Sequence, residues 1–97
     1  MNNRMRMRDK ALNALNELGD TPEHVATTLY RKGIKGEAGK CFICPIANYL
    51  SMIMGFTIQV DGARAKALIN ELDVTLPMAV QQFITGFDYG RYPQLLY

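Results

Sequence analysis

The stretch F-T-I-Q-V-D-G, residues 56–62, decides which fold class the sequence predicts. Its first five residues alternate apolar and polar side chains and are rich in β-branched residues, which is typical of a half-buried strand. Asp61-Gly62 is a strong signal for a hairpin turn. The segment that follows, A-R-A-K-A-L-I at residues 63–69, fits either a returning strand or a helix, and we favour the strand. With residues 73–76 as a third extended segment, the sequence predicts a small antiparallel β-hairpin or meander.

Helices surround this predicted sheet. Apolar residues at helical spacing, bounded by proline or glycine, indicate four helices: residues 9–18, 22–32, 45–54 and a segment that begins at Pro77. Residues 1–8 are expected to form a frayed terminus, and residues 33–43 a glycine-rich basic loop. The predicted fold is a single α+β domain over residues 1–97, with N-terminal helices, a Cys-Pro-led helix, the small sheet, a Pro-led C-terminal helix and a docked aromatic tail.

The composition is that of a globular protein. The chain has 97 residues, of which 48% are hydrophobic and 21% charged, and its formal net charge is +2. Basic residues gather in residues 1–10 and 31–40. This charge is too small to favour a nucleic-acid partner, and weak nucleic-acid binding by these two segments is kept as an alternative. No apolar run reaches the roughly 20 residues of a membrane span, and the N-terminus does not look like a signal peptide. We therefore expect a cytoplasmic protein without a membrane partner.

Few residues of the sequence are candidates for catalysis or metal binding. Cys41 and Cys44 form a C-x-x-C motif before a predicted helix N-terminus, a setting that activates thiols. With His24, the only histidine, they are the soft metal ligands of the chain. A thiol or metal protein is therefore an alternative function, but structural cysteines are the favoured interpretation. Because the glycine-rich loop lacks P-loop spacing and no catalytic triad or carboxylate pair is evident, we expect no catalytic residue, no metal and no cofactor, and hence no enzyme.

The residue types that anchor protein interfaces gather in the tail. The candidate partner-binding residues are Tyr89, Arg91, Tyr92 and Tyr97 in the tail, with Lys35 and Lys40 in the glycine-rich loop. The sequence therefore predicts a small non-enzymatic protein-interaction or regulatory protein, which binds another protein through the tail, the loop or both. A homodimer is a second way to cover the aromatic residues.

Three motifs together resemble small uncharacterised proteins of actinobacteria and their phages. They are G-I-K-G at residues 33–36, C-P-I-A-N-Y-L at residues 44–50 and L-P-M-A-V-Q-Q-F-I-T-G-F-D-Y-G-R-Y-P at residues 76–93. The resemblance implies a Cys-Pro-led helix, a short β segment and a Leu-Pro-led helix that ends in Phe-Asp-x-Gly-x-Tyr-Pro. Our leading hypothesis is therefore a phage-encoded interaction protein that acts on a host protein.

Overall fold

The computed structural model describes residues 3–40 and 42–97, and it confirms the α+β class. The elements follow in the order α1 (Asn3–Glu17), α2 (Pro22–Arg31), α3 (Pro45–Met54), β1 (Gln59–Asp61), β2 (Lys66–Ile69), β3 (Leu72–Thr75), α4 (Met78–Asp88) and a short 3-10 helix, η1 (Pro93–Leu95). None of the helices in the described part of the chain has the length and apolar character that crossing a membrane requires.

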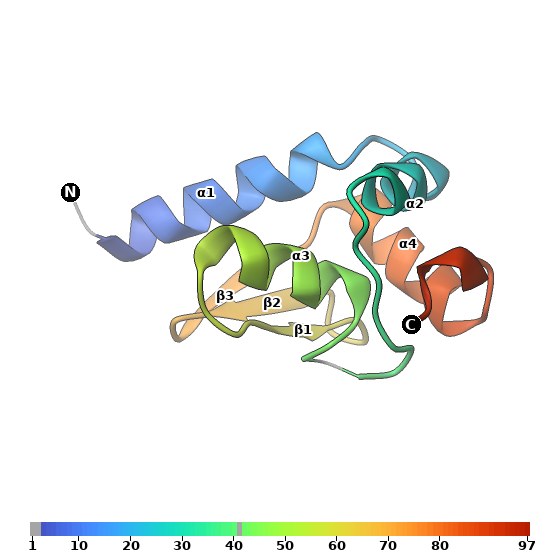
Figure 1. The fold of residues 1–97 in the computed structure, drawn as a ribbon. Helices are drawn as coiled ribbons and strands as arrows, with labels where there is room; N and C mark the ends of the chain where they lie inside the picture. Colours follow the sequence, from blue (N-terminus) through green and yellow to red (C-terminus); the bar gives the residue numbers. More distant parts are fainter. Residues whose placement is uncertain (1–2, 41) are drawn as a thin grey trace.

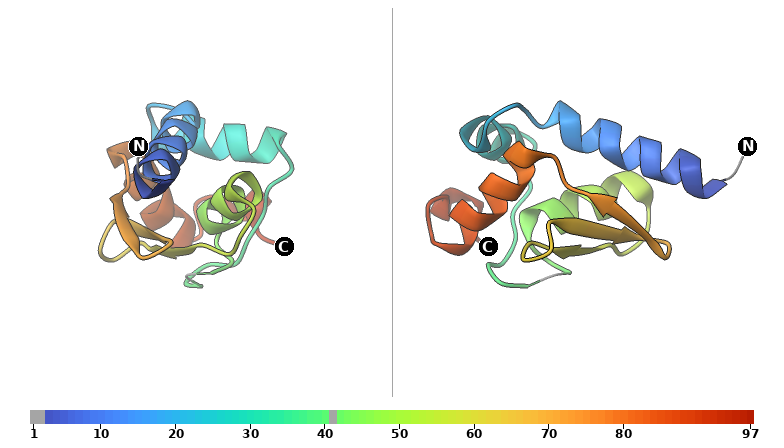
Figure 2. Two further views of the ribbon diagram at one scale, coloured as in Figure 1. Left: turned by 90° about the vertical axis from the view of Figure 1, so that its left-hand side faces the viewer. Right: turned by 180° about the vertical axis from the view of Figure 1, so that it is seen from behind.

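The elements form two neighbouring parts of an elongated molecule that measures 40 × 22 × 22 Å (Figure 1). In the first part α1 packs on α3 and β3, and α3 packs on β1, so that the sheet lies beneath the two helices (Figure 2). In the second part α2 packs on α4 and η1. One hydrophobic core runs through both parts; its largest fully buried side chains are Phe83, Phe87, Leu15, Leu18, Leu29, Ile46, Leu50, Ile58, Ile69, Leu76, Leu95 and Val25.

The sheet is the predicted antiparallel meander, with strand order β1-β2-β3. β2 confirms that residues 66–69 form a strand rather than a helix, and its Ala67 pairs with Val60 on one side and Val74 on the other. The first turn is longer than the two residues that Asp61-Gly62 predicts, because Asp61 still pairs with Lys66 and residues 62–65 form the turn. The Asp61 carboxylate accepts a hydrogen bond from the backbone N–H of Arg64 at 3.2 Å, which stabilises this wider turn.

Helix α1 begins at Asn3 and therefore includes residues 3–8, which the sequence assigns to a frayed terminus. Met7 explains part of the difference, since its side chain packs against the core. Its sulfur also accepts a 3.7 Å hydrogen bond from the Asn70 side chain in the turn between β2 and β3. Tertiary contacts thus extend the helix beyond the segment in which the apolar spacing is regular.

The predicted ends of α2 and α3 are confirmed. The Thr21 hydroxyl accepts the N–H of His24 at 3.1 Å and caps α2, and Pro22 occupies its first turn. At α3, Cys44 is the N-cap, and Gly55 ends the helix with a left-handed backbone (φ 83°).

Candidate protein-binding groove

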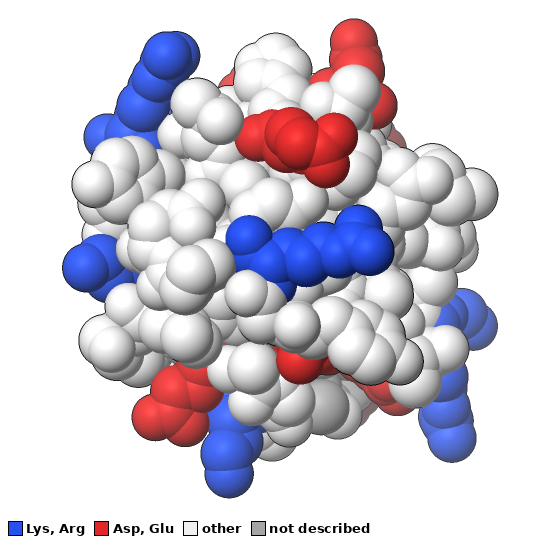
Figure 3. Space-filling model, turned by 90° about the vertical axis from the view of Figure 1, so that its right-hand side faces the viewer, with Lys and Arg blue, Asp and Glu red and all other residues white. Residues whose placement is uncertain are grey.

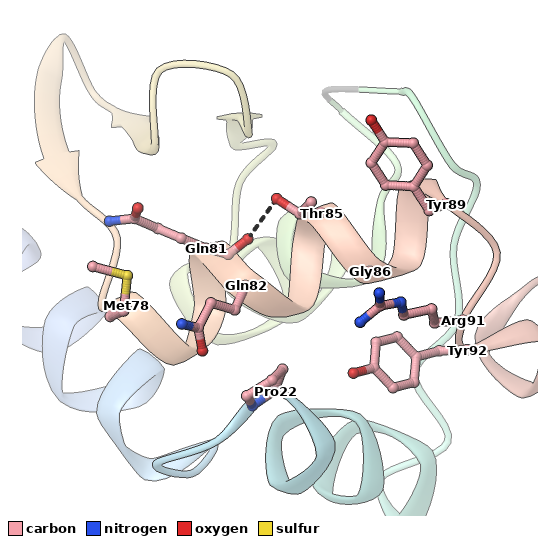
Figure 4. Close-up of a pocket in the computed structure, with 9 residues that line it drawn as sticks. All are labelled: Pro22, Met78, Gln81, Gln82, Thr85, Gly86, Tyr89, Arg91 and Tyr92. Carbon is pink, nitrogen blue, oxygen red and sulfur yellow. Dashed lines mark hydrogen bonds between the residues drawn. The ribbon is translucent and has the colours of Figure 1, made fainter.

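A groove of about 470 Å³ lies between the exposed face of α4, the N-terminus of α2 and the tail (Figure 4). We call it the α4 groove and define it by its lining residues, which are Pro22, Met78, Gln81, Gln82, Thr85, Gly86, Tyr89, Arg91 and Tyr92. The first of these residues lies about 70 positions before the last. The groove therefore exists only because α2 and the tail both pack against α4.

Gly86 makes the close approach of the tail possible. A Cβ atom at this position would lie 2.9 Å from Cε2 of Tyr92 and 3.4 Å from Cδ of Arg91. Contacts below 3.0 Å do not occur at real Cβ atoms, so any larger residue would displace Tyr92. Gly86 is buried under the tail, and its missing side chain leaves room for Tyr92 against α4.

Tyr92 forms one wall of the groove. Its ring stacks on Phe83, with 5.2 Å between the ring centroids, and its hydroxyl donates a 3.1 Å hydrogen bond to Oε2 of Glu23 in α2. Burial, followed by the hydrogen bond to Glu23, raises the pKa of Tyr92 above the ordinary tyrosine value of 10.0. Tyr92 is therefore a neutral hydrogen-bond donor that joins the tail to α2.

Arg91 is the only charged residue among those that line the groove. Its guanidinium points into the groove, between Gly86 and the ring of Tyr92 (Figure 4). No carboxylate in residues 3–40 or 42–97 forms an ion pair with it. Figure 3 shows this face of the molecule, most of which is neither acidic nor basic. An anionic group that entered the groove would therefore meet a guanidinium that no carboxylate in the described part of the chain already pairs with.

The rim of the groove is apolar and exposed. Tyr89 is 83% exposed and Met78 is 65% exposed, at opposite ends of α4. Two side chains between them are already engaged, because Gln81 donates to the Leu76 carbonyl at 2.7 Å and Thr85 donates to the Gln81 carbonyl at 3.2 Å. The side chains that the groove can offer to a partner are therefore mainly those of Met78, Gln82, Tyr89 and Arg91.

The structure divides the sequence-predicted partner-binding residues into two groups. Tyr89, Arg91 and Tyr92 meet in the α4 groove, whereas Lys35, Lys40 and Tyr97 do not line it. Sequence reasoning missed Met78, Gln82 and Gly86 as members of the same site. Their spacing of four residues could have shown that they share one helix face. Nothing in the sequence shows that Pro22 closes the opposite wall.

The glycine-rich loop and the tail form a second joined surface, centred on Asn48 of α3. The Nδ2 group of Asn48 lies 2.7 Å from the Lys35 carbonyl, 3.2 Å from the Ile43 carbonyl and 3.0 Å from the Tyr97 hydroxyl. Gly36 adds a parallel β-bridge to Leu96. Lys35 and Tyr97, which the sequence places in separate segments, are therefore neighbours, whereas Lys40 lies beside a smaller hollow of about 190 Å³ together with Cys44 and Asp88.

Cys44 and His24 have local structural contacts. Cys44 is buried, and its Sγ accepts the N–H of Ala47 at 3.4 Å. The His24 side chain in α2 covers Gly19 so closely that a Cβ atom there would lie 2.5 Å from its ring. No group of three or more His, Cys, Asp and Glu residues in the described part of the chain could hold a metal ion. Cys41, the other candidate thiol or metal ligand from the sequence, lies outside the described residues.

The two basic segments do not form one surface. The basic N-terminal turns belong to α1, at the end of the molecule marked N in Figure 1, whereas the segment 31–40 starts at the end of α2, on the other side of α3, and descends to the lower side of the molecule (Figures 1 and 2). This separation does not favour one continuous basic surface for a nucleic acid.

The fold and the groove define a small α+β domain with a single-cation, partly apolar binding surface. Compared with protein-family models, with curated proteins and with solved structures, the chain matches none of them. The resemblance to actinobacterial and phage proteins stays a prediction.

Proposed function

We propose that this protein is a non-enzymatic interaction protein that binds a segment of another protein in the α4 groove. One observation supports the proposal more than the others: the groove combines an exposed tyrosine and an exposed methionine with Arg91, which forms no ion pair with residues 3–40 or 42–97. Tyrosine, methionine and arginine are the residue types enriched at protein interfaces.

The lining residues indicate what the partner segment presents. Met78 and Tyr89 offer apolar contact at the two ends of the groove, and methionine adapts to different side-chain shapes. Arg91 offers a planar donor that suits a carboxylate. The segment that fits best therefore carries an acidic side chain between two apolar ones. The resemblance to phage proteins makes a host protein of an actinobacterium the first partner to look for.

The experiment is affinity capture from an actinobacterial lysate, followed by direct binding measurements with the captured protein. The test variant combines Met78→Ala, Tyr89→Ala and Arg91→Glu, because all three side chains are exposed and their loss leaves the core intact. Tyr92 stays unchanged, since its ring stacks on Phe83 and supports the fold.

The matched control combines Tyr30→Ala and Arg31→Glu, which removes an exposed tyrosine and arginine at the far end of α2 from Pro22. We expect the wild type and the control to retain the same partner and the test variant to lose it. A partner retained equally by all three proteins would contradict the role of the α4 groove, and no specific partner at all would contradict the proposed function.

A further inference from the structure

A second surface, on the first part of the molecule, carries a charge pattern that the proposed function does not use. Arg6, Lys10, Asn13 and Glu17 are exposed on α1, at spacings of four, three and four residues. Such spacings place them in one stripe along the helix. The stripe is basic towards the N-terminus of α1 and acidic at its C-terminal end, over about three helical turns.

The stripe borders two adjoining hollows beside α1. One has about 490 Å³ and reaches from Arg6 to Glu17 along α1, with Ile53 of α3 opposite. The other has about 300 Å³, shares Arg6 and Lys10, and is lined by three half-buried apolar residues, Met7, Met54 and Phe56. We call the two hollows together the α1–α3 groove. It has apolar contact area beside a charged helix face, which is the arrangement of a helix-binding groove.

The charged residues that line the α1–α3 groove indicate which kind of helix could bind there. The α1–α3 groove is lined by two cations, Arg6 and Lys10, and by two anions, Asp9 and Glu17. A uniformly acidic or basic partner would be repelled at one end. A helix with the same charge order fits when it runs in the opposite direction, because its acidic end then lies against the basic end of α1. Helix α1 of a second copy has that order.

We propose that a second copy of this chain binds in the α1–α3 groove, with the two α1 helices antiparallel about a twofold axis. In the register that matches the charges, Arg6 lies opposite Glu17 of the second copy, and Lys10 lies opposite Asn13. The twofold axis repeats each of these pairs. The two α1–α3 pairs then form a four-helix arrangement, in which Ile53, Met54 and Phe56 lose solvent contact.

Charge exchange tests this register. Arg6→Glu and Glu17→Arg each place like charges in both repeated pairs, so each variant alone should dimerise more weakly than the wild type. Because exposed ion pairs contribute up to about 1 kcal/mol each, two lost and reversed pairs should raise the dimer dissociation constant by about tenfold or more. Mixing the two variants in equal amounts restores both pairs and should restore the dimer. The double variant Arg6→Glu/Glu17→Arg should dimerise like the wild type.

The measurement is sedimentation velocity over a range of protein concentrations at low and high salt. We expect the wild-type dimer to weaken as salt rises, because salt screens exposed charges. Arg8→Glu is the matched control: Arg8 is exposed on α1 and does not line either hollow, so its reversal should leave the dimer unchanged. A wild type that is monomeric at every concentration would refute the proposal. Single variants that dimerise as well as the wild type, or a mixture that does not regain the dimer, would refute the register.

Discussion

Replacing Asn48 with aspartate tests whether one amide holds the glycine-rich loop and the tail together. The substitution keeps the shape of the side chain and replaces the Nδ2 donor with an oxygen. That oxygen would face the carbonyl oxygens of Lys35 and Ile43, which now accept hydrogen bonds at 2.7 and 3.2 Å. The two hydrogen bonds lost to the loop carbonyls at this half-buried site cost about 2 kcal/mol, and repulsion between the oxygens adds to this loss. The third bond, to the Tyr97 hydroxyl, can reverse its direction, because a hydroxyl donates to a carboxylate. We therefore expect the melting temperature to fall by about 10 °C or more.

The assay is chemical denaturation of the wild type, Asn48→Asp and Asn48→Ala at neutral pH. Asn48→Ala should cost less than Asn48→Asp, because alanine loses the donor without placing an anion against two carbonyls. Protonation returns a donor to the aspartate variant, so its stability should approach that of Asn48→Ala as the pH falls towards about 4. Asn16→Asp introduces the same charge at an exposed position of α1 and should change stability by less than about 0.5 kcal/mol. Asn48→Asp as stable as the wild type would refute the reasoning.

Three further predictions follow from close contacts and burial. Gly36→Ala places a Cβ atom against the Ile43 carbonyl and should lower the free energy of unfolding by about 1–3 kcal/mol in urea denaturation; an unchanged value would contradict the fixed loop path. Gly86→Ala should change the near-ultraviolet circular dichroism of the tyrosines, because Tyr92 must move. It should also lower stability, although alanine has the better helix propensity. A spectrum like that of the wild type would show that Tyr92 does not move. The fold favours the neutral form of Tyr92, so the contribution of this phenol to the free energy of unfolding should be constant below pH 10.0 and should fall as the pH rises above that value. Tyr92→Phe should flatten the decline. An equal decline in both proteins would contradict the raised pKa of Tyr92.

The sequence predicted the elements whose signals are local. Pro22 and Pro45 at helix starts and Gly55 at a helix end each act within a few residues, and the structure confirms them. The alternation over residues 56–60 located the first strand only in part, because β1 covers Gln59–Asp61 and residues 56–58 lie outside it. The predicted length of the first hairpin turn was wrong. Asp61 pairs with Lys66, and this register depends on which side chains of the two strands are buried in the core.

The candidate site was predicted in part. The aromatic tail identified Tyr89 and Arg91, which line the α4 groove. It also identified Tyr92, which lines the same groove, but the stacking of the Tyr92 ring on Phe83 is a tertiary contact that no local sequence pattern shows. Pro22 and the tail are far apart in the chain, so the groove between them could not be seen before the helices were placed.

The bridge between Gly36 and the tail determines the order in which the chain can fold. The Gly36 N–H donates to the Leu95 carbonyl at 2.8 Å, and the Tyr97 N–H donates to the Gly36 carbonyl at 3.3 Å. These bonds close a loop of about 60 residues, which carries a large entropic cost until the intervening helices and sheet have formed. We therefore expect the bridge to form last on folding and to open first under native conditions, with the amide hydrogens of Gly36 and Tyr97 exchanging with solvent before those of the buried strands.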